Sequence, residues 1–172
     1  MSLHRKNTCL GILLVIALPG LVSCDPEVDC QATNEGTETM GVEQVSLVNS
    51  RGKLVDITAM IADDANERAQ GYQHICSEVI DSTTILFVYP TPIMASFHMS
   101  NVKAPLDIGF FDAQGKLVSV QKMETYTETH KPLYSPGRPF RFALEARAGF
   151  FAESGFAEQT TRLIPGSIGD GE

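Results

Sequence analysis

The sequence contains no run of more than two basic residues. Acidic residues outnumber basic ones by 21 to 13, which gives a formal net charge of -8 at pH 7. Binding to nucleic acid depends on clustered positive charge. The composition therefore argues against a nucleic-acid-binding protein.

The sequence also lacks the short motifs of several enzyme and metal-site classes. It has neither a Cys-x-x-Cys pair nor two closely spaced histidines, which argues against a zinc site. No Gly-x-Ser-x-Gly motif presents a serine nucleophile, and no glycine-rich loop lies between a strand and a helix to hold a phosphate. We therefore expect no metal and no cofactor.

What the sequence has is enough apolar residues for one core. The chain of 172 residues is 43% hydrophobic and 20% charged, with 14 glycines and 9 prolines. This composition excludes a largely disordered, collagen-like or coiled-coil protein. A chain of this size has little room for two cores, so we expect one domain, over residues 42–165.

The N-terminal residues have the parts of an export signal. A basic stretch at 4–6 precedes an apolar run at 11–18, which is shorter than the roughly 20 residues that cross a bilayer. The run is closed by LVSC at 21–24, which resembles the lipobox of bacterial lipoproteins. We expect a signal peptide at 1–23 and lipidation at Cys24. The alternatives are an ordinary secretory signal with an incidental cysteine, or a retained N-terminal helix.

Lipidation would place the domain in the bacterial cell envelope, outside the cytoplasm and anchored to a membrane. Asp25 directly follows the anchor and slightly favours the inner membrane. Residues 24–41 are rich in Asp, Glu, Thr and Gly and predict a flexible tether. Residues 166–172 predict a flexible C-terminus.

Two cysteines remain in the mature domain once the signal is removed and Cys24 carries lipid. Cys30 and Cys76 are then exported to a compartment where disulfides persist. A bridge between them is a candidate, with two free thiols as the alternative, because spacing does not show that two Cβ atoms can meet.

Short β-branched stretches separated by turn residues predict a sheet. The residues NSRG at 49–52 predict a hairpin turn, and an aspartate before ANERAQG at 65–71 predicts a short helix that ends at the glycine. The expected strands cover 42–48, 53–61, 83–89, 94–101, 106–111, 116–120, 140–145 and 160–164, with a second helix at 148–154 and a long loop at 124–139. The fold class is α+β and β-rich: an antiparallel-dominated curled sheet or small barrel with about two short helices.

Three motifs resemble the domain of unknown function 192 family. They read ERAQG at 67–71, FHMSNVKAPLDIGF at 97–110, and LE at 144–145 followed by AGF and GF. The resemblance implies a β-rich fold and a cell-envelope setting for exported members, without an established reaction or ligand. His98 stands where the family pattern has Trp, Ser100 where it often has Lys, and Tyr72-Gln73 where it usually has Leu-Met.

The candidate site residues lie around one tight connection. If 94–101 pairs with 106–111, His98 and Asp107 would lie about 5 Å apart at Cβ, close enough for the acid to orient the imidazole. Asn101 would complete the group. The alternative is that Asn101 and Asp107 cap the loop by bonding to main chain.

Glu145 is a further candidate for ligand binding, with an ordinary surface pair to Arg141 as the alternative. We expect a lipid-anchored envelope domain that binds a small ligand or a protein partner near the hairpin at 97–107. There are two alternatives. One is a hydrolase- or lyase-type enzyme that uses His98 oriented by Asp107, and the other is a structural interaction module.

Overall fold

The structure is a computed structural model that describes residues 29–164. The expected signal peptide, the lipidation site Cys24, Asp25 and the C-terminal residues 166–172 lie outside the described residues. None of the helices between residues 29 and 164 has the length and apolar character that a membrane span requires.

Seven strands form one sheet in the order β5-β4-β6-β3-β2-β1-β7. All neighbouring strands are antiparallel except β2 and β3, which are parallel. The strands are β1 (Gly41–Val48), β2 (Leu54–Ala62), β3 (Ile85–Ile93), β4 (Leu106–Phe111), β5 (Leu117–Met123), β6 (Phe140–Arg147) and β7 (Arg162–Leu163).

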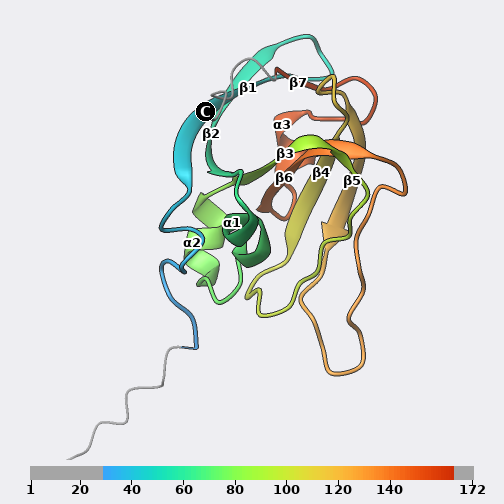
Figure 1. The fold of residues 1–172 in the computed structure, drawn as a ribbon. Helices are drawn as coiled ribbons and strands as arrows, with labels where there is room; N and C mark the ends of the chain where they lie inside the picture. The colour runs from blue at the N-terminus through green and yellow to red at the C-terminus, as the bar shows by residue number, and fades with distance from the viewer. Residues whose placement is uncertain (1–28, 165–172) are drawn as a thin grey trace, which may run out of the picture.

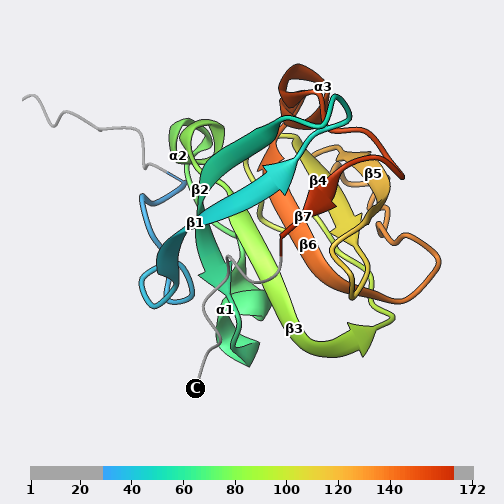
Figure 2. The ribbon, with the colours of Figure 1, turned by 90° about the horizontal axis from the view of Figure 1, so that it is seen from above.

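The sheet is strongly curled, as Figure 2 shows from above, but it is not a closed barrel. β7 lies beside β1, and an isolated bridge between Arg162 and Lys116 also brings it to the beginning of β5. The prediction of a β-rich α+β fold with a curled, antiparallel-dominated sheet is therefore confirmed.

Three short helices accompany the sheet: α1 (Ala65–Gln70), α2 (Ser77–Ser82) and α3 (Phe150–Ser154). Helix α2 was not predicted. It lies with α1 in the crossover between the parallel strands β2 and β3, and parallel neighbours need such a long connection. Figures 1 and 2 both place α3 away from α1 and α2.

Local sequence signals explain the first hairpin and the first helix. In the turn between β1 and β2, the Asn49 side chain accepts hydrogen bonds from two backbone amides, and Gly52 has a φ of 75°. Asp64 caps α1 by accepting from the amide of Glu67, whose buried carboxylate accepts in turn from the Asp64 amide. Both predictions are confirmed.

The strand predicted at 94–101 is not formed. β3 continues through Pro90 and Pro92 to Ile93, and the residues that follow make only one bridge, between Phe97 and Tyr134 of the loop at 124–139. The physical reason is that β4 is hydrogen-bonded to β5 on one side and to β6 on the other. β4 therefore has no free edge with which 94–101 could pair.

The curled sheet is buried on both faces. One face carries an apolar cluster that includes Ile85, Ile108 and Phe110, and the other carries a cluster that includes Leu144 and Phe151. β6 lies between β3 and β4 and is buried on both sides over most of its length.

The tether expected over 24–41 ends well before Gly41. From residue 30 onward the segment packs on the domain: Asn34 is 7% exposed and donates hydrogen bonds to the carbonyls of Gly71 (3.0 Å) and Gln73 (2.8 Å). The high content of Asp, Glu and Thr predicted flexibility. The Asn34 side chain instead hydrogen-bonds to the main chain and fixes this segment on the domain. Residues 30–41 therefore pack on the domain in the described part of the chain.

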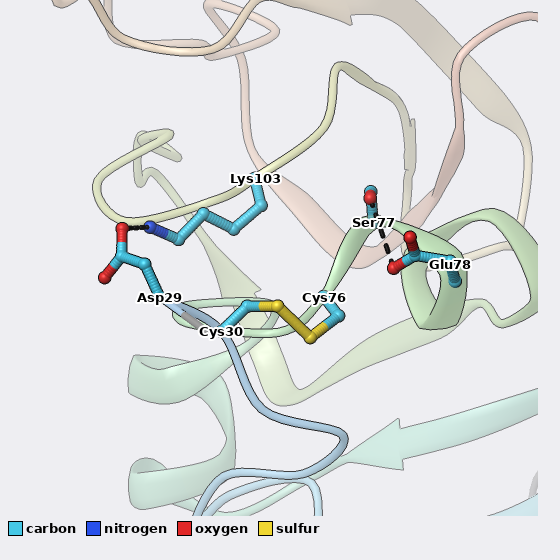
Figure 3. The surroundings of a disulfide bond; sticks show 6 residues. All are labelled: Asp29, Cys30, Cys76, Ser77, Glu78 and Lys103. Atoms are coloured by element: carbon cyan, nitrogen blue, oxygen red, sulfur yellow. Dashed lines mark hydrogen bonds and ion pairs between the residues drawn. A yellow bond between two sulfur atoms is a disulfide. The ribbon is translucent and has the colours of Figure 1, made fainter. Parts of the chain in front are cut away.

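A disulfide joins Cys30 to Cys76, with Cα atoms 4.9 Å apart (Figure 3). The adjacent Asp29 forms an ion pair with Lys103, whose nitrogen lies 2.5 Å from the carboxylate. The backbone of Gln31 also pairs with the backbone on both sides of Ile75, through His74 and Cys76. These contacts fasten the N-terminal segment to the turn between α1 and α2.

Candidate functional site

A cleft of about 200 Å³ opens on the face of the sheet that carries α1. Its walls come from the end of α1 and the turn after it, from β3, and from the irregular segment that follows β3. The lining residues that matter below are Arg68, Gly71, Phe87, Tyr89, His98 and Glu145.

Glu145 is the buried acid of this cleft. It lies on β6 between Ile85 of β3 and Ile108 of β4, and is 5% exposed. Among residues 29–164, no group donates a hydrogen bond to its carboxyl or forms an ion pair with it. Burial raises the pKa of Glu145 to about 8, so most of the molecules hold this acid neutral at pH 7.

Gly71 keeps the space beside this acid open. Its φ of 47° with ψ of -134° is a backbone conformation suited to glycine. A Cβ there would lie 3.3 Å from Phe87 Cζ and 3.9 Å from Glu145 Oε2. The glycine of the ERAQG motif thus ends α1 and also leaves the Glu145 carboxyl accessible from the cleft.

Aromatic side chains surround the acid. Tyr72 is buried and its hydroxyl lies 3.1 Å from the Thr83 hydroxyl; burial raises the pKa of Tyr72 well above its ordinary range. Burial also raises the pKa of Tyr89. Phe87 and Phe97 meet edge to face, with ring centroids 5.1 Å apart.

Arg68 is the one Arg or Lys side chain among the lining residues, and its guanidinium already has other partners. Its guanidinium donates to the carbonyls of Val88 (3.1 Å) and Asp63, and lies 5.1 Å from the centroid of the Tyr89 ring. It forms no ion pair with Glu145. Arg68 therefore joins α1 to β3 and leaves the buried acid without a counterion.

Of the sequence-predicted residues, His98 also lines the cleft. It is exposed, and its Nδ1 accepts a hydrogen bond from the amide of Ser100 at 3.3 Å. His98, which stands where the domain of unknown function 192 family pattern has Trp, is thus part of the cleft wall.

Asn101 lies next to the cleft but holds main chain. Its φ is 60°, and its carbonyl accepts a hydrogen bond from the His74 amide at 2.8 Å. Its side-chain amide donates to Gln73, a cleft residue, over 3.4 Å. The Asn101 side chain thus bonds to another side chain, and the bond to main chain that the alternative expected is not formed among the described residues.

Asp107 lies on the opposite face of the sheet. It is 7% exposed and accepts hydrogen bonds from the amides of Gly149, at 2.9 Å, and Phe151. Burial raises its pKa, while these hydrogen bonds act in the other direction. The structure therefore does not bring Asp107 together with His98, and no acid-oriented imidazole is formed.

Glu145 is not the surface partner of Arg141. The Arg141 guanidinium donates instead to the Tyr89 carbonyl at 3.1 Å.

The sequence predicted Glu145 as a site residue but not Arg68, Gly71 and Tyr89. The ERAQG motif was a usable signal for the first two, and nothing local marked Tyr89. Within residues 29–164, no three His, Cys, Asp or Glu side chains are grouped to hold a metal.

These features define a class: a small β-rich α+β domain with a cleft on one face of a curled sheet and a mostly buried acid in the cleft wall. Residues 46–161 match the domain of unknown function 192 family (DUF192), described as "Uncharacterized ACR". The match covers more than half of the sequence, so this chain belongs to that family.

Two solved structures share the fold. One, from Sinorhizobium meliloti 1021, is described as a "putative transcription regulator"; it is 23% identical with a TM-score of 0.65, over 73% of this chain and 94% of that one. The other is a protein of unknown function from Novosphingobium aromaticivorans DSM 12444, 20% identical with a TM-score of 0.63, over 80% and 95%. No curated protein matches the chain.

Proposed function

We propose that this chain is a lipid-anchored cell-envelope domain that binds a small ligand in the Glu145 cleft. The observation that carries the proposal is the Glu145 carboxyl, which is 5% exposed and has no partner among the described residues. No fully buried side-chain oxygen or nitrogen among the described residues lacks a hydrogen-bond partner, so the Glu145 oxygens reach solvent through the cleft. A mostly buried acid that opens only into a concave site, with no protein partner there, points to a group supplied from outside.

The composition of the cleft supports a small-molecule ligand. The cleft places aromatic rings beside polar side chains such as Arg68, Gln73 and Ser96, so it suits a small compound with both apolar and polar groups. The volume of about 200 Å³ suits a compound smaller than most drugs. A protein partner would need a larger contact area than this cleft offers, unless it inserted a single side chain.

The anchor part of the proposal rests on the LVSC motif at 21–24. If Cys24 is acylated, six residue steps separate it from Cys30, where the domain is fastened by the disulfide. Such a length of chain reaches at most roughly 20 Å. The domain would then stand close to the membrane surface.

The test is a screen of small amines, carboxylates and alcohols by amide NMR spectra of the folded domain. A ligand of the cleft should shift the amides of Gly71, Tyr89 and Phe97. Ser96→Trp, at the exposed rim of the cleft, should weaken the binding. Shifts confined to the opposite face, near Asp107, or no saturable binding by any class, would overturn the proposal.

A second candidate function is an enzyme in which Glu145 gives or takes a proton. The raised pKa favours it, because acids with a pKa near the working pH serve as general acids and bases. His98 lines the same cleft and could assist, without Asp107. Conversion of a bound compound, lost in Glu145→Gln, would favour the enzyme; binding without conversion would favour the binding domain.

A further inference from the structure

We infer that the ligand of this cleft is an organic cation, with an ammonium group that lies against the Glu145 carboxylate. The inference rests on the proposed function and specifies its ligand class. It starts from the placement of a single acid, 5% exposed, between Ile85 and Ile108.

A buried carboxylate without a counterion is costly, and a cation that pairs with it offsets that cost. The chain does not supply this cation: the three ion pairs among the described residues do not include Glu145. Arg68, the one Arg or Lys side chain that lines the cleft, is held by two backbone carbonyls and the Tyr89 ring. The position of the counterion is thus left to a ligand.

The surroundings of the acid suit an organic cation better than a metal ion or an anion. The rings of Phe87, Tyr89 and Phe97 line the same cleft, and aromatic rings attract ammonium groups. A divalent metal would need several oxygen or nitrogen ligands, and no group of three acid, histidine or cysteine side chains occurs among residues 29–164. An anion would be repelled by the ionised form of the acid, which is the form that a cation stabilises.

Access to the carboxyl limits the size of the cation. The missing side chain at Gly71 leaves room beside Oε2, where a Cβ would come within 3.9 Å. The cleft as a whole holds about 200 Å³. A trimethylammonium or primary ammonium group on a short chain fits these limits.

Binding of a cation should also release a proton, because Glu145 is mostly neutral at pH 7 in the free domain. The other titratable or charged groups that face the cleft are Arg68 from α1, Tyr72 from the turn after it, Tyr89 from β3 and His98 from the segment after β3. β4 contributes the apolar Ile108. Affinity for the cation should therefore rise from roughly pH 6, below the Glu145 pKa, to roughly pH 9, above it.

The experiment compares matched probes on the folded domain. Choline is compared with 3,3-dimethylbutanol, its uncharged carbon analogue, and butylammonium with butanol and butyrate. Dissociation constants come from amide NMR titrations, and proton release from calorimetry in two buffers that differ in ionisation enthalpy. Glu145→Gln removes the charge at the site, and Glu128→Gln removes the same charge from the exposed loop at 124–139.

We expect each cation to bind about tenfold or more tightly than its uncharged analogue, a difference of roughly 1.4 kcal/mol. The preference should disappear in Glu145→Gln and persist in Glu128→Gln. Equal affinity for the uncharged analogue, or a preference that survives in Glu145→Gln, would overturn the inference. If only butanol or butyrate binds in the cleft, the inference fails while the proposed function stands; if no probe or screened compound binds, both fail.

Discussion

Asp107 and Glu145 lie on the neighbouring strands β4 and β6, offset by one residue, and therefore face opposite sides of the sheet. Asp107 is opposite Ala146, whereas Glu145 is opposite Ile108. The two buried acids consequently have different surroundings. Asp107 accepts hydrogen bonds from two backbone amides near α3, whereas Glu145 faces the cleft, where no described residue donates to its carboxyl.

The first prediction concerns Asp107 as a structural residue. Asp107→Ala leaves the part-buried amide of Gly149 and the amide of Phe151 without this acceptor, which should destabilise the domain by about 1–3 kcal/mol. Urea unfolding measures the change. Ligand binding in the cleft should be unaltered at temperatures where the variant is folded; a loss of binding with unchanged stability would place Asp107 in the site after all.

The second prediction concerns the pH dependence of stability. The pKa of Glu145 is raised to about 8 from 4.5, so between these values the unfolded chain releases a proton that the folded domain keeps. Stability should therefore fall as pH rises from about 5 to 8, by an amount on the order of 4 kcal/mol for this group. The unfolding free energy measured across this range checks it.

Glu145→Gln provides the control for this pH dependence. The amide has no proton to lose, so the variant should match the parent domain in stability near pH 5 and exceed it near pH 9. Glu128→Gln, in the exposed loop, should leave the slope of the parent unchanged. Parallel curves for the parent and Glu145→Gln would contradict the burial of a neutral acid.

The third prediction concerns the disulfide. Cys30 and Cys76 are 46 residues apart, and removing a link over such a loop should cost about 4 kcal/mol. The double variant Cys30→Ser, Cys76→Ser should show this loss in urea unfolding. Mass analysis of the parent under non-reducing conditions should find no free thiol in the domain; two free thiols would refute the bridge.

The same variant should loosen the cleft. Asn34 holds the carbonyls of Gly71 and Gln73, and the disulfide fixes the segment that carries Asn34. Amide exchange at Gly71 should therefore become faster without the disulfide, whereas exchange at Gly109 in β4 should change only as much as global stability does.

How much of the molecule the sequence predicts depends on whether a signal is local. The cap at Asp64, the turn at Asn49 and the end of α1 at Gly71 are set by neighbouring residues, and all three were predicted. The fate of 94–101 depends instead on strand order. Since β6 and β5 occupy both edges of β4, a stretch with good alternation is left irregular.

The candidate site shows the same limit. Glu145 follows Arg141 at a spacing typical of a surface pair, and only the central position of β6 buries it. His98 and Asp107 would share a site only if 94–101 paired with β4, and β5 and β6 take both sides of β4 instead. Which strands pair is decided by long-range contacts that the local sequence does not encode.

The fourth prediction concerns the anchor. Cys24→Ser should move the protein from the membrane fraction to the soluble fraction of the envelope, because the acyl chains would have no attachment site. Immunoblots of fractionated cells measure this. Unchanged retention in the membrane fraction would show that LVSC at 21–24 is not the anchor motif.

The most direct measurement is a pH titration of the Glu145 carboxyl carbon by NMR in the ¹³C-labelled domain, assigned by comparison with Glu145→Gln. A buried acid without a partner should titrate with a pKa of about 8, and addition of a cation that occupies the cleft should lower that value. A pKa near 4.5, unchanged by any bound cation, would contradict the description of Glu145 as the unpaired acid at the centre of a ligand site.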